Sequence, residues 1–438
     1  MADEDGGAWY FITDSNIIKN LDRMPIHHKI NPSDRKRIVR TSSRHSTAKA
    51  RVSVSKDLED SFYITNSVVP PGSEGYYDVT LESPFGSDSE KEDKPEDGKR
   101  SECERVYLAA CKQCRVAPGK GVLQGLGSQR LSVKGLQLTS REIEPITYAL
   151  TRNHHVTTLD VSSNDIGKDG LNNILRMLDE NMSLTSLNIS HNNVGSAGAR
   201  LLSELIANSK LLKTISASGN KFADEDASCI AESLKVSRVL QTLNLSHNNF
   251  HERGGETLAE GIEENTSLTD LDLSWNHLRL GGAIAIAEAL KENKMLENLN
   301  IAWNGFSNAG CKVISASLEV NTKLHTLNLS NNRIGYEGAR SLARALMTNQ
   351  NLTHLQLNLN SLSTLGAFEL LVAIRDNPGS AIEKLELEEV PVLASAQAIE
   401  QEIKSVRPSF ILIHDVVVLS DDHLALASVV NKRKVVKS

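Results

Sequence analysis

The sequence has few cysteines and no long apolar run, and each shortage excludes a class of protein. Its 438 residues include five cysteines, an odd number, and Cys229 and Cys311 fall at helical positions of a repeat. Such cysteines do not suggest the disulfide framework of a secreted domain. No apolar stretch approaches the roughly 18–20 residues of a membrane span, and the acidic start lacks a signal peptide's basic and apolar regions. We therefore expect a cytoplasmic protein in a reducing compartment, with no membrane partner.

Signatures of catalysis and of nucleic-acid binding are lacking as well. The formal net charge is −7, which argues against a dedicated nucleic-acid binder. No phosphate-binding G-x-x-x-x-G-K-[ST] segment occurs in the chain. Cys111-x-x-Cys114 resembles half of a zinc site, but no second pair completes it, so two helical cysteines explain it better. We expect no enzyme, no cofactor, no metal and no small-molecule substrate.

The sequence does contain one asparagine that recurs at a fixed interval of 28 residues. The frame around it reads L-x-x-L-x-L-x-x-N-x-L, as at Leu268, Leu271, Leu273, Asn276 and Leu278, and apolar residues at helical spacing follow. A strand period therefore gives way to a helix period within each repeat. The repeated residues are Asn164, Asn192, Asn220, Asn248, Asn276, Asn304, Asn332 and Asn360.

This pattern predicts an α/β solenoid with the shape of a horseshoe. Parallel strands lie about 4.8 Å apart, whereas the returning helices need about 8–10 Å between their axes. Stacking elements of unequal spacing bends the array, with strands on the concave face and helices on the convex face. Because an asparagine amide can both donate and accept, we expect the eight asparagines to form a structural ladder that satisfies loop backbone groups of adjacent repeats.

Composition and repeat together divide the chain into four regions. The first is rich in charged and small polar residues without an apolar period, which predicts a disordered tail. The regions are the N-terminal tail 1–100, a capping helix region 101–128, the solenoid 129–394, and a C-terminal cap with a basic tail 395–438. Around Asn220, the residues Ala217, Ala223 and Asp226 depart from the frame, so we expect the most distorted interior repeat there.

The repeats resemble a known class of protein. The frames at 159–167 (LDVSSNDIG) and 327–335 (LNLSNNRIG) resemble the ribonuclease-inhibitor-like leucine-rich repeats, over roughly residues 129–394. The segments 107–111 (YLAAC) and 406–408 (VRP) are most similar to the leucine-rich repeat-containing protein 74 group. The resemblance implies an intracellular protein without a catalytic motif. Some proteins with this repeat type serve in cilia and sperm flagella, which adds a cilium or flagellum as an expected setting.

The residue before each ladder asparagine varies most, and here two of the chain's three tryptophans, Trp275 and Trp303, occupy adjacent repeats. Their backbones should lie about 4.8 Å apart, so their rings can stack into the kind of exposed anchor that dominates protein interfaces. The sequence leaves open a second arrangement, in which the indoles lie flat over the strand-exit loops. The predicted partner-binding set is Trp275, Trp303, His247, His277, Asp270, Asp272, Asn298, Asn300 and Asn331.

Other polar residues of this face do not indicate chemistry. Serines two positions before the asparagines are expected to point outward, but no base is paired with them. His191 and His247 sit two repeats apart, about 10 Å by the strand spacing, which is too far for one zinc ion. Asp270 and Asp272 share a strand face without an evident acid–base partner or pocket, so surface charge explains them better.

Two functions remain open at this point. The first is a non-enzymatic scaffold that binds a protein partner of unknown identity on the concave face, as a monomer. The alternative is a GTPase-activating protein of the Ran-activating leucine-rich repeat type, which would supply an arginine against bound nucleotide. Arg152, Arg279 and Arg333 lie on or near loops, but the chain ends in basic residues and lacks that family's acidic C-terminal tail. We therefore favour the scaffold.

Overall fold

The computed structural model describes residues 100–418, with side chains described through Asp415. Apart from Arg100, the tail predicted to be disordered lies outside the described residues, as does most of the predicted basic tail. Within the described part, no helix has the length and apolar character needed to cross a membrane.

Strands and helices alternate through the described residues, as the change of period predicts. The strands β1 to β10 are Arg130–Ser132, Thr158–Asp160, Ser186–Asn188, Thr214–Ser216, Thr242–Asn244, Asp270–Asp272, Asn298–Asn300, Thr326–Asn328, His354–Gln356 and Lys384–Glu386. The helices α5 to α13 between them are Ser140–Thr151, Gly167–Glu180, Gly195–Asn208, Asp224–Val236, Glu252–Glu264, Arg279–Glu292, Ser307–Leu318, Tyr336–Leu346 and Ser363–Asp376.

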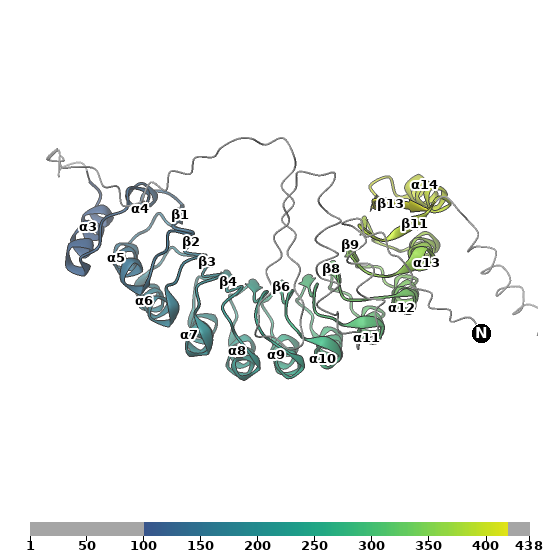
Figure 1. Cartoon of the computed structure of the whole chain (residues 1–438), viewed down its shortest axis with the longest axis horizontal. Coiled ribbons are helices and arrows are strands. Elements are labelled where there is room, and N and C mark those ends of the chain that lie inside the picture. Colours follow the sequence, from purple (N-terminus) through teal and green to yellow (C-terminus); the bar gives the residue numbers. More distant parts are fainter. Residues whose placement is uncertain (1–99, 419–438) are drawn as a thin grey trace, which may run out of the picture. The chain divides into compact units, whose positions relative to one another are not determined.

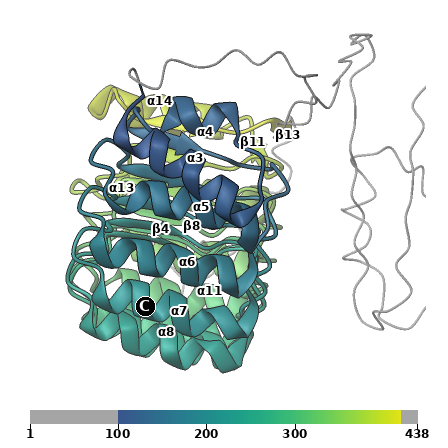
Figure 2. The ribbon, with the colours of Figure 1, turned by 90° about the vertical axis from the view of Figure 1, so that its left-hand side faces the viewer.

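The strands form one parallel sheet in sequence order. Among the described residues it has 11 strands, β1 to β10 followed by β12 (Ile411–Ile413). Each strand pairs with the next in the same register, so that Leu243 lies opposite Leu271, and Leu271 opposite Leu299. Figure 1 shows this repeat array as an arc with the strands on the inner side and the helices on the outer side. Viewed from its end, the array is a stack of strand–helix layers (Figure 2). The predicted α/β solenoid is confirmed.

The core lies between the sheet and the helices, along the whole array. In β2 to β9 the central residue of each strand is buried, while its two neighbours are only half-buried. In the repeat of Asn276, the strand residues Leu271 and Leu273 and the helix residues Ile286 and Leu290 are at most 3% exposed. Burying such side chains is worth about 1.5–3 kcal/mol each, and the repetition makes the core continuous.

Short elements close both ends of the array. At the N-terminal end, α3 (Glu102–Cys114) packs against α5, and Arg141 of α5 donates hydrogen bonds to the carbonyl oxygens of Cys114 and Arg115. The segment continues through α4 (Lys120–Gly125), where Gly119 N donates to the Tyr107 hydroxyl. At the C-terminal end lie β11 (Pro391–Leu393), α14 (Ala396–Val406) and β13 (Val416–Val418), and β11 pairs with β13.

The asparagine of each repeat joins its own turn to the preceding one. Asn276 is 1% exposed, and its Nδ2 donates to the carbonyl oxygens of Leu245 (3.1 Å) and Leu273 (3.0 Å). Its Oδ1 accepts from the backbone N–H of Phe250, 3.2 Å away in the preceding loop. The other seven asparagines make the same two kinds of bond. One amide per repeat thus satisfies groups of two turns that water cannot reach.

A second row of buried amides runs along the opposite edge, where each helix ends and the next strand begins. Asn293 Nδ2 donates to the carbonyl oxygen of Ile262 (2.6 Å), and its Oδ1 accepts from the N–H of Leu296 (2.8 Å). The row consists of Asn153, Asn181, Asn265, Asn293, Asn321, Asn349 and Asn377, with Ser209 and Ser237 in the two remaining repeats. This row was not predicted, although its interval of 28 residues is visible in the sequence.

The repeat of Asn220 does not interrupt the sheet, contrary to the expectation of distortion. β4 pairs with both neighbours in the common register. The unusual Asp226 accepts hydrogen bonds from Ala223 N (2.9 Å) and from the Ser196 hydroxyl (2.8 Å). A side-chain carboxylate therefore caps the start of α8 where other repeats use a glycine.

Replacing Asn276 by alanine should destabilise the array. The change leaves the carbonyl oxygen of Leu245 and the N–H of Phe250 without their partner in a buried loop. We expect a loss of about 2–3 kcal/mol in the free energy of unfolding, measured by urea denaturation. The matched control is Asn249→Ala, at an exposed asparagine, which should change stability by less than about 0.5 kcal/mol. Equal stabilities of the two variants would contradict the role given to the amide.

In the second row, serine should replace asparagine better than alanine does. Ser209 accepts from the N–H of Leu212 at 3.0 Å, so a hydroxyl can keep the acceptor half of the role. We expect Asn293→Ser to cost about 1 kcal/mol and Asn293→Ala about 2–3 kcal/mol, because alanine leaves both backbone partners unpaired. Urea denaturation of the two variants tests this order, and a reversed order would count against it.

Candidate functional site

The residue before each ladder asparagine has an unusual backbone conformation. All seven non-glycine residues at this position have φ between 49° and 59°, in the left-handed region. They are Ser163, His191, His247, Trp275, Trp303, Asn331 and Leu359. That conformation costs roughly 1–2 kcal/mol for a residue with a Cβ atom. It directs the chain out of the strand, so that the next residue points its amide inward, and it aligns one side chain per repeat along the strand-exit rim.

Four aromatic side chains of this column form a continuous series, which we call the ring row. It consists of His191, His247, Trp275 and Trp303. The indoles of Trp275 and Trp303 are stacked, with ring centroids 3.9 Å apart and planes inclined by 11°. His247 continues the stack on the other side of Trp275, at 5.0 Å and 15°. The rings therefore face one another and do not lie flat over the loops.

His191 joins the row across the repeat of Gly219. A Cβ atom at Gly219 would lie 2.2 Å from His191 Nδ1, so the imidazole occupies the space that glycine leaves free. The ring centroids of His191 and His247 are 6.3 Å apart, at an interplanar angle of 52°. The separation of about 10 Å expected from the strand spacing was wrong, because it located the backbones and ignored the tilt of the ring over a glycine.

The ring row is presented to solvent along its edge. Trp275 is 40% exposed and Trp303 is 36% exposed, and both histidines are exposed as well. Each stacked ring is held in place by its neighbours. Its side chain therefore loses less conformational entropy when a partner binds. A large rigid aromatic surface that remains open to water is typical of a protein-binding anchor.

Amides and carboxylates lie on the strands beside the ring row. Asp270 Oδ1 accepts a hydrogen bond of 2.8 Å from Asn298 Nδ2 in the next repeat. Asp272 and Asn300 accept from the backbone N–H two residues ahead, as Asn328 does in its repeat. These last bonds support the strand exits, so the polar strand residues have a structural role that was not predicted from the sequence. All four residues of the predicted set on β6 and β7 are half-buried.

Two imidazoles of this face, those of His247 and His277, sit in environments that disfavour their charged form. Burial lowers the pKa of His247, the proximity of His191 lowers it further, and Asp272 acts in the opposite direction. His277 stacks with His251, at a centroid distance of 5.2 Å, and so belongs to a different pair from the ring row. Burial likewise lowers the pKa of His277, with smaller contributions from His251 and Arg279. Asn331 follows Trp303 in the same column and is half-buried.

The serines two positions before the ladder asparagines do not lie on the surface. Ser190, Ser218, Ser246 and Ser274 are at most 6% exposed, so the expectation that they point outward was wrong. Their place is the turn where the strand ends, and the left-handed residue that follows rotates them inward. Hydroxyls of neighbouring repeats bond to each other, as between Ser246 and Ser218 at 3.0 Å.

The described residues contain no group of three or more histidine, cysteine or acidic side chains that could hold a metal ion. All five cysteines are free, and burial raises the pKa of Cys311 to about 12. What this face offers is a rigid aromatic row beside a polar strand surface.

Comparison with known proteins gives a family for the repeats. Seven segments match the model of the Leucine Rich repeat family, at residues 152–175, 180–203, 236–259, 264–287, 292–315, 320–343 and 348–371. No curated protein matches the chain. One similar solved structure is the tropomodulin C-terminal domain of Caenorhabditis elegans, with 22% identity over 34% of this chain and 90% of that one, and a TM-score of 0.30.

The family match and the geometry agree on the same unit. The matched segments cover every interior repeat except that of Asn220, whose frame departs most from the others. Residues 152–371 are therefore built of leucine-rich repeats, and the described part of the chain is a leucine-rich repeat solenoid.

Proposed function

We propose that this protein is a non-enzymatic scaffold that binds a protein partner on its concave face, with the ring row as the anchor. The observation that carries this proposal is the stacked and exposed pair Trp275–Trp303. Leucine-rich repeats generally bind proteins, and an open curved sheet suits a macromolecular partner. The cytoplasmic localisation, the ciliary setting and the likeness to the leucine-rich repeat-containing protein 74 group remain part of the proposal.

The ring row lies where a binding anchor is expected, away from the ends of the array. Interface hot spots are enriched in tryptophan and are flanked by weaker polar contacts. The ring row occupies interior repeats, with the half-buried Asp270, Asn298 and Asn300 beside it on the strands. A partner that covers the row would desolvate two indoles whose positions are already fixed. The polar strand residues would then set orientation more than affinity.

The polar groups of this face support recognition better than catalysis. Asp270 is hydrogen-bonded to Asn298, and Asp272 is hydrogen-bonded to the backbone of its own strand exit. The hydroxyls of Ser190, Ser218 and Ser246 bond to other serine hydroxyls and not to a histidine. Arg279, one of the arginines weighed for GTPase activation, lies close enough to His277 to lower its pKa. No specific observation favours the GTPase-activating alternative.

Removing both indoles should weaken partner binding without affecting the fold. We expect Trp275→Ala combined with Trp303→Ala to reduce capture of a specific partner by at least about ten-fold, because hot-spot truncations cost about 2 kcal/mol or more. The measurement is quantitative affinity capture with the full chain, followed by titration of the captured protein. Tyr148→Ala, at a half-exposed tyrosine on the outer helix α5, is the matched control and should leave capture unchanged. A partner set unaffected by the double change would refute the anchor.

The stack should report the protonation of His247. Because its pKa lies below the ordinary value of 6.5, the folded protein takes up this proton only at lower pH than the unfolded chain does. Folding stability therefore decreases as pH falls through 6.5, while the imidazole stacked on Trp275 stays neutral at about pH 7. We expect a fluorescence titration of the indole stack with a midpoint below 6.5, absent in His247→Gln. A midpoint above 6.5 would contradict this environment.

A further inference from the structure

The outer face of the array carries an apolar strip in its central helices, α10 and α11. Leu280 and Ile284 of α10 are 40% and 43% exposed, and Val313 of α11 packs only partly against the core. Ala309 and Ala316 of α11 extend the strip and are exposed. Outer faces of solenoid helices are ordinarily polar, so an exposed apolar strip here indicates contact with another molecule.

An acidic ridge borders the strip on the side of α9. It consists of Glu252, Glu256 and Glu260, all exposed. A Cβ atom at Gly281 of α10 would lie 2.8 Å from Glu252 Oε2 and 2.9 Å from Glu256 Oε1. The two carboxylates therefore lean across the groove between α9 and α10, into space that Gly281 leaves free.

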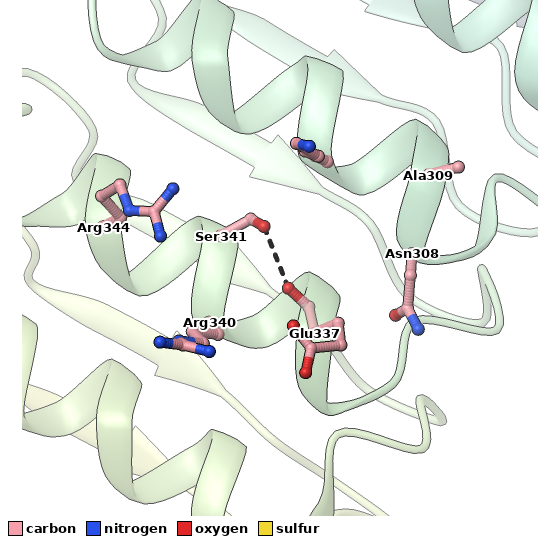
Figure 3. Close-up of a pocket in the computed structure, with 7 residues that line it drawn as sticks. Asn308, Ala309, Glu337, Arg340, Ser341 and Arg344 are labelled. Atoms are coloured by element: carbon pink, nitrogen blue, oxygen red, sulfur yellow. Dashed lines mark hydrogen bonds between the residues drawn. The ribbon is translucent and has the colours of Figure 1, made fainter.

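A basic pocket borders the strip on the other side, between α11 and α12. It has a volume of about 270 Å³ and is lined by Asn308, Ala309, Lys312, Glu337, Arg340, Ser341 and Arg344. Figure 3 shows Arg340 and Arg344 projecting from one side of α12, with the Ser341 hydroxyl bonded to the carbonyl oxygen of Glu337. Asn308 is held by the N–H groups of Gly335 and Gly338, both of which donate to its Oδ1. The exposed charges of the pocket are predominantly positive.

The interval of 28 residues places these groups at matching heights on successive helices. One level holds Glu256, Ile284, Lys312 and Arg340, and the next holds Glu260, Glu288, Ala316 and Arg344. Along both levels the charge changes from negative on α9 to positive on α12. A two-fold rotation about an axis parallel to the helices, between α10 and α11, preserves height and exchanges α9 with α12. Under this rotation Glu256 lies opposite Arg340 and Glu260 opposite Arg344 of the second copy, so the charged flanks are complementary, and Ile284 lies opposite Lys312 at the centre.

We propose that this outer face binds a second copy of the chain about that axis. At the centre the apolar side chain of Ile284 packs against the aliphatic stem of Lys312 of the other copy, and the carboxylate of Glu256 reaches Arg340 in the basic pocket of that copy. The outer curvature of the array turns α9 and α12 away from the partner, so long glutamate and arginine side chains are what can close that distance (Figure 1). An interface of four helices predicts a weak reversible dimer, with Kd on the order of 1–100 µM, that dissociates as salt screens the charges.

A pair of charge reversals tests the proposal with the full chain. In sedimentation equilibrium, Glu256→Arg and Arg340→Glu should each raise the dimer Kd by at least about ten-fold, because each sets like charges opposite one another at two symmetric contacts. Mixing the two variants in equal amounts should restore dimerisation as a heterodimer. There the substituted side chains face each other, and the native Glu256 of one chain faces the native Arg340 of the other.

A charge reversal outside the apolar strip provides the control. Glu204→Arg reverses an exposed charge on α7, outside the strip, and should leave the dimer Kd within about two-fold. Ile284→Lys sets an ammonium group opposite Lys312 of the other copy at two symmetric contacts and should abolish dimerisation in either charge background. A wild-type chain that stays monomeric up to about 500 µM would overturn the proposal, since that exceeds the expected Kd. So would a mixture that associates no better than the separate variants.

Discussion

The rest of the structure depends on one buried amide per repeat at the strand exit. Its Nδ2 donates to carbonyl oxygens of its own and the preceding turn, and its Oδ1 accepts from the preceding loop. No strand in the described array is longer than three residues in its assigned bounds, so sheet hydrogen bonds alone tie neighbouring repeats weakly. The amide adds a fixed, buried connection at one edge, and the row around Asn293 adds a second at the other. Each turn is thereby held at both of its corners.

That constraint also creates the concave site. For the amide to point inward, the residue before it adopts the left-handed conformation in every repeat, at the same place on the rim. A column of side chains results whose spacing is the strand spacing, which is close to the stacking distance of aromatic rings. Trp275 and Trp303 stack at 3.9 Å because the backbone brings them there. Each repeat that has a side chain at this position therefore carries one strained left-handed residue there. The side chains of these residues are aligned along the strand-exit rim.

The features that follow from the repeat interval could be predicted from the sequence. It identified the strand and helix periods, the solenoid, and the adjacency of Trp275 and Trp303. It could not place His191 beside His247, because that contact needs a ring to tilt over Gly219. The rotation of the serines into the turn was also missed, since strict strand alternation assigns them to the surface and only the backbone dihedral of the next residue corrects this. The second amide row, in contrast, recurs at the same interval of 28 residues, so the sequence alone contains the signal that predicts it.

On both faces of the array, the residues that build the core are different from the residues that meet solvent. Buried amides, serines and apolar side chains fill the interior, so the side chains that point to solvent can differ from one repeat to the next. On the concave side such side chains are rings in consecutive repeats. On the outer side the position eight residues after the ladder asparagine changes from Glu256 through Ile284 and Lys312 to Arg340. Because the repeat sets these residues at one height on successive helices, the charge of the outer face changes from negative on α9 to positive on α12. Because the sheet and the core separate the two faces, a partner on one and a second copy on the other would not compete for the same residues.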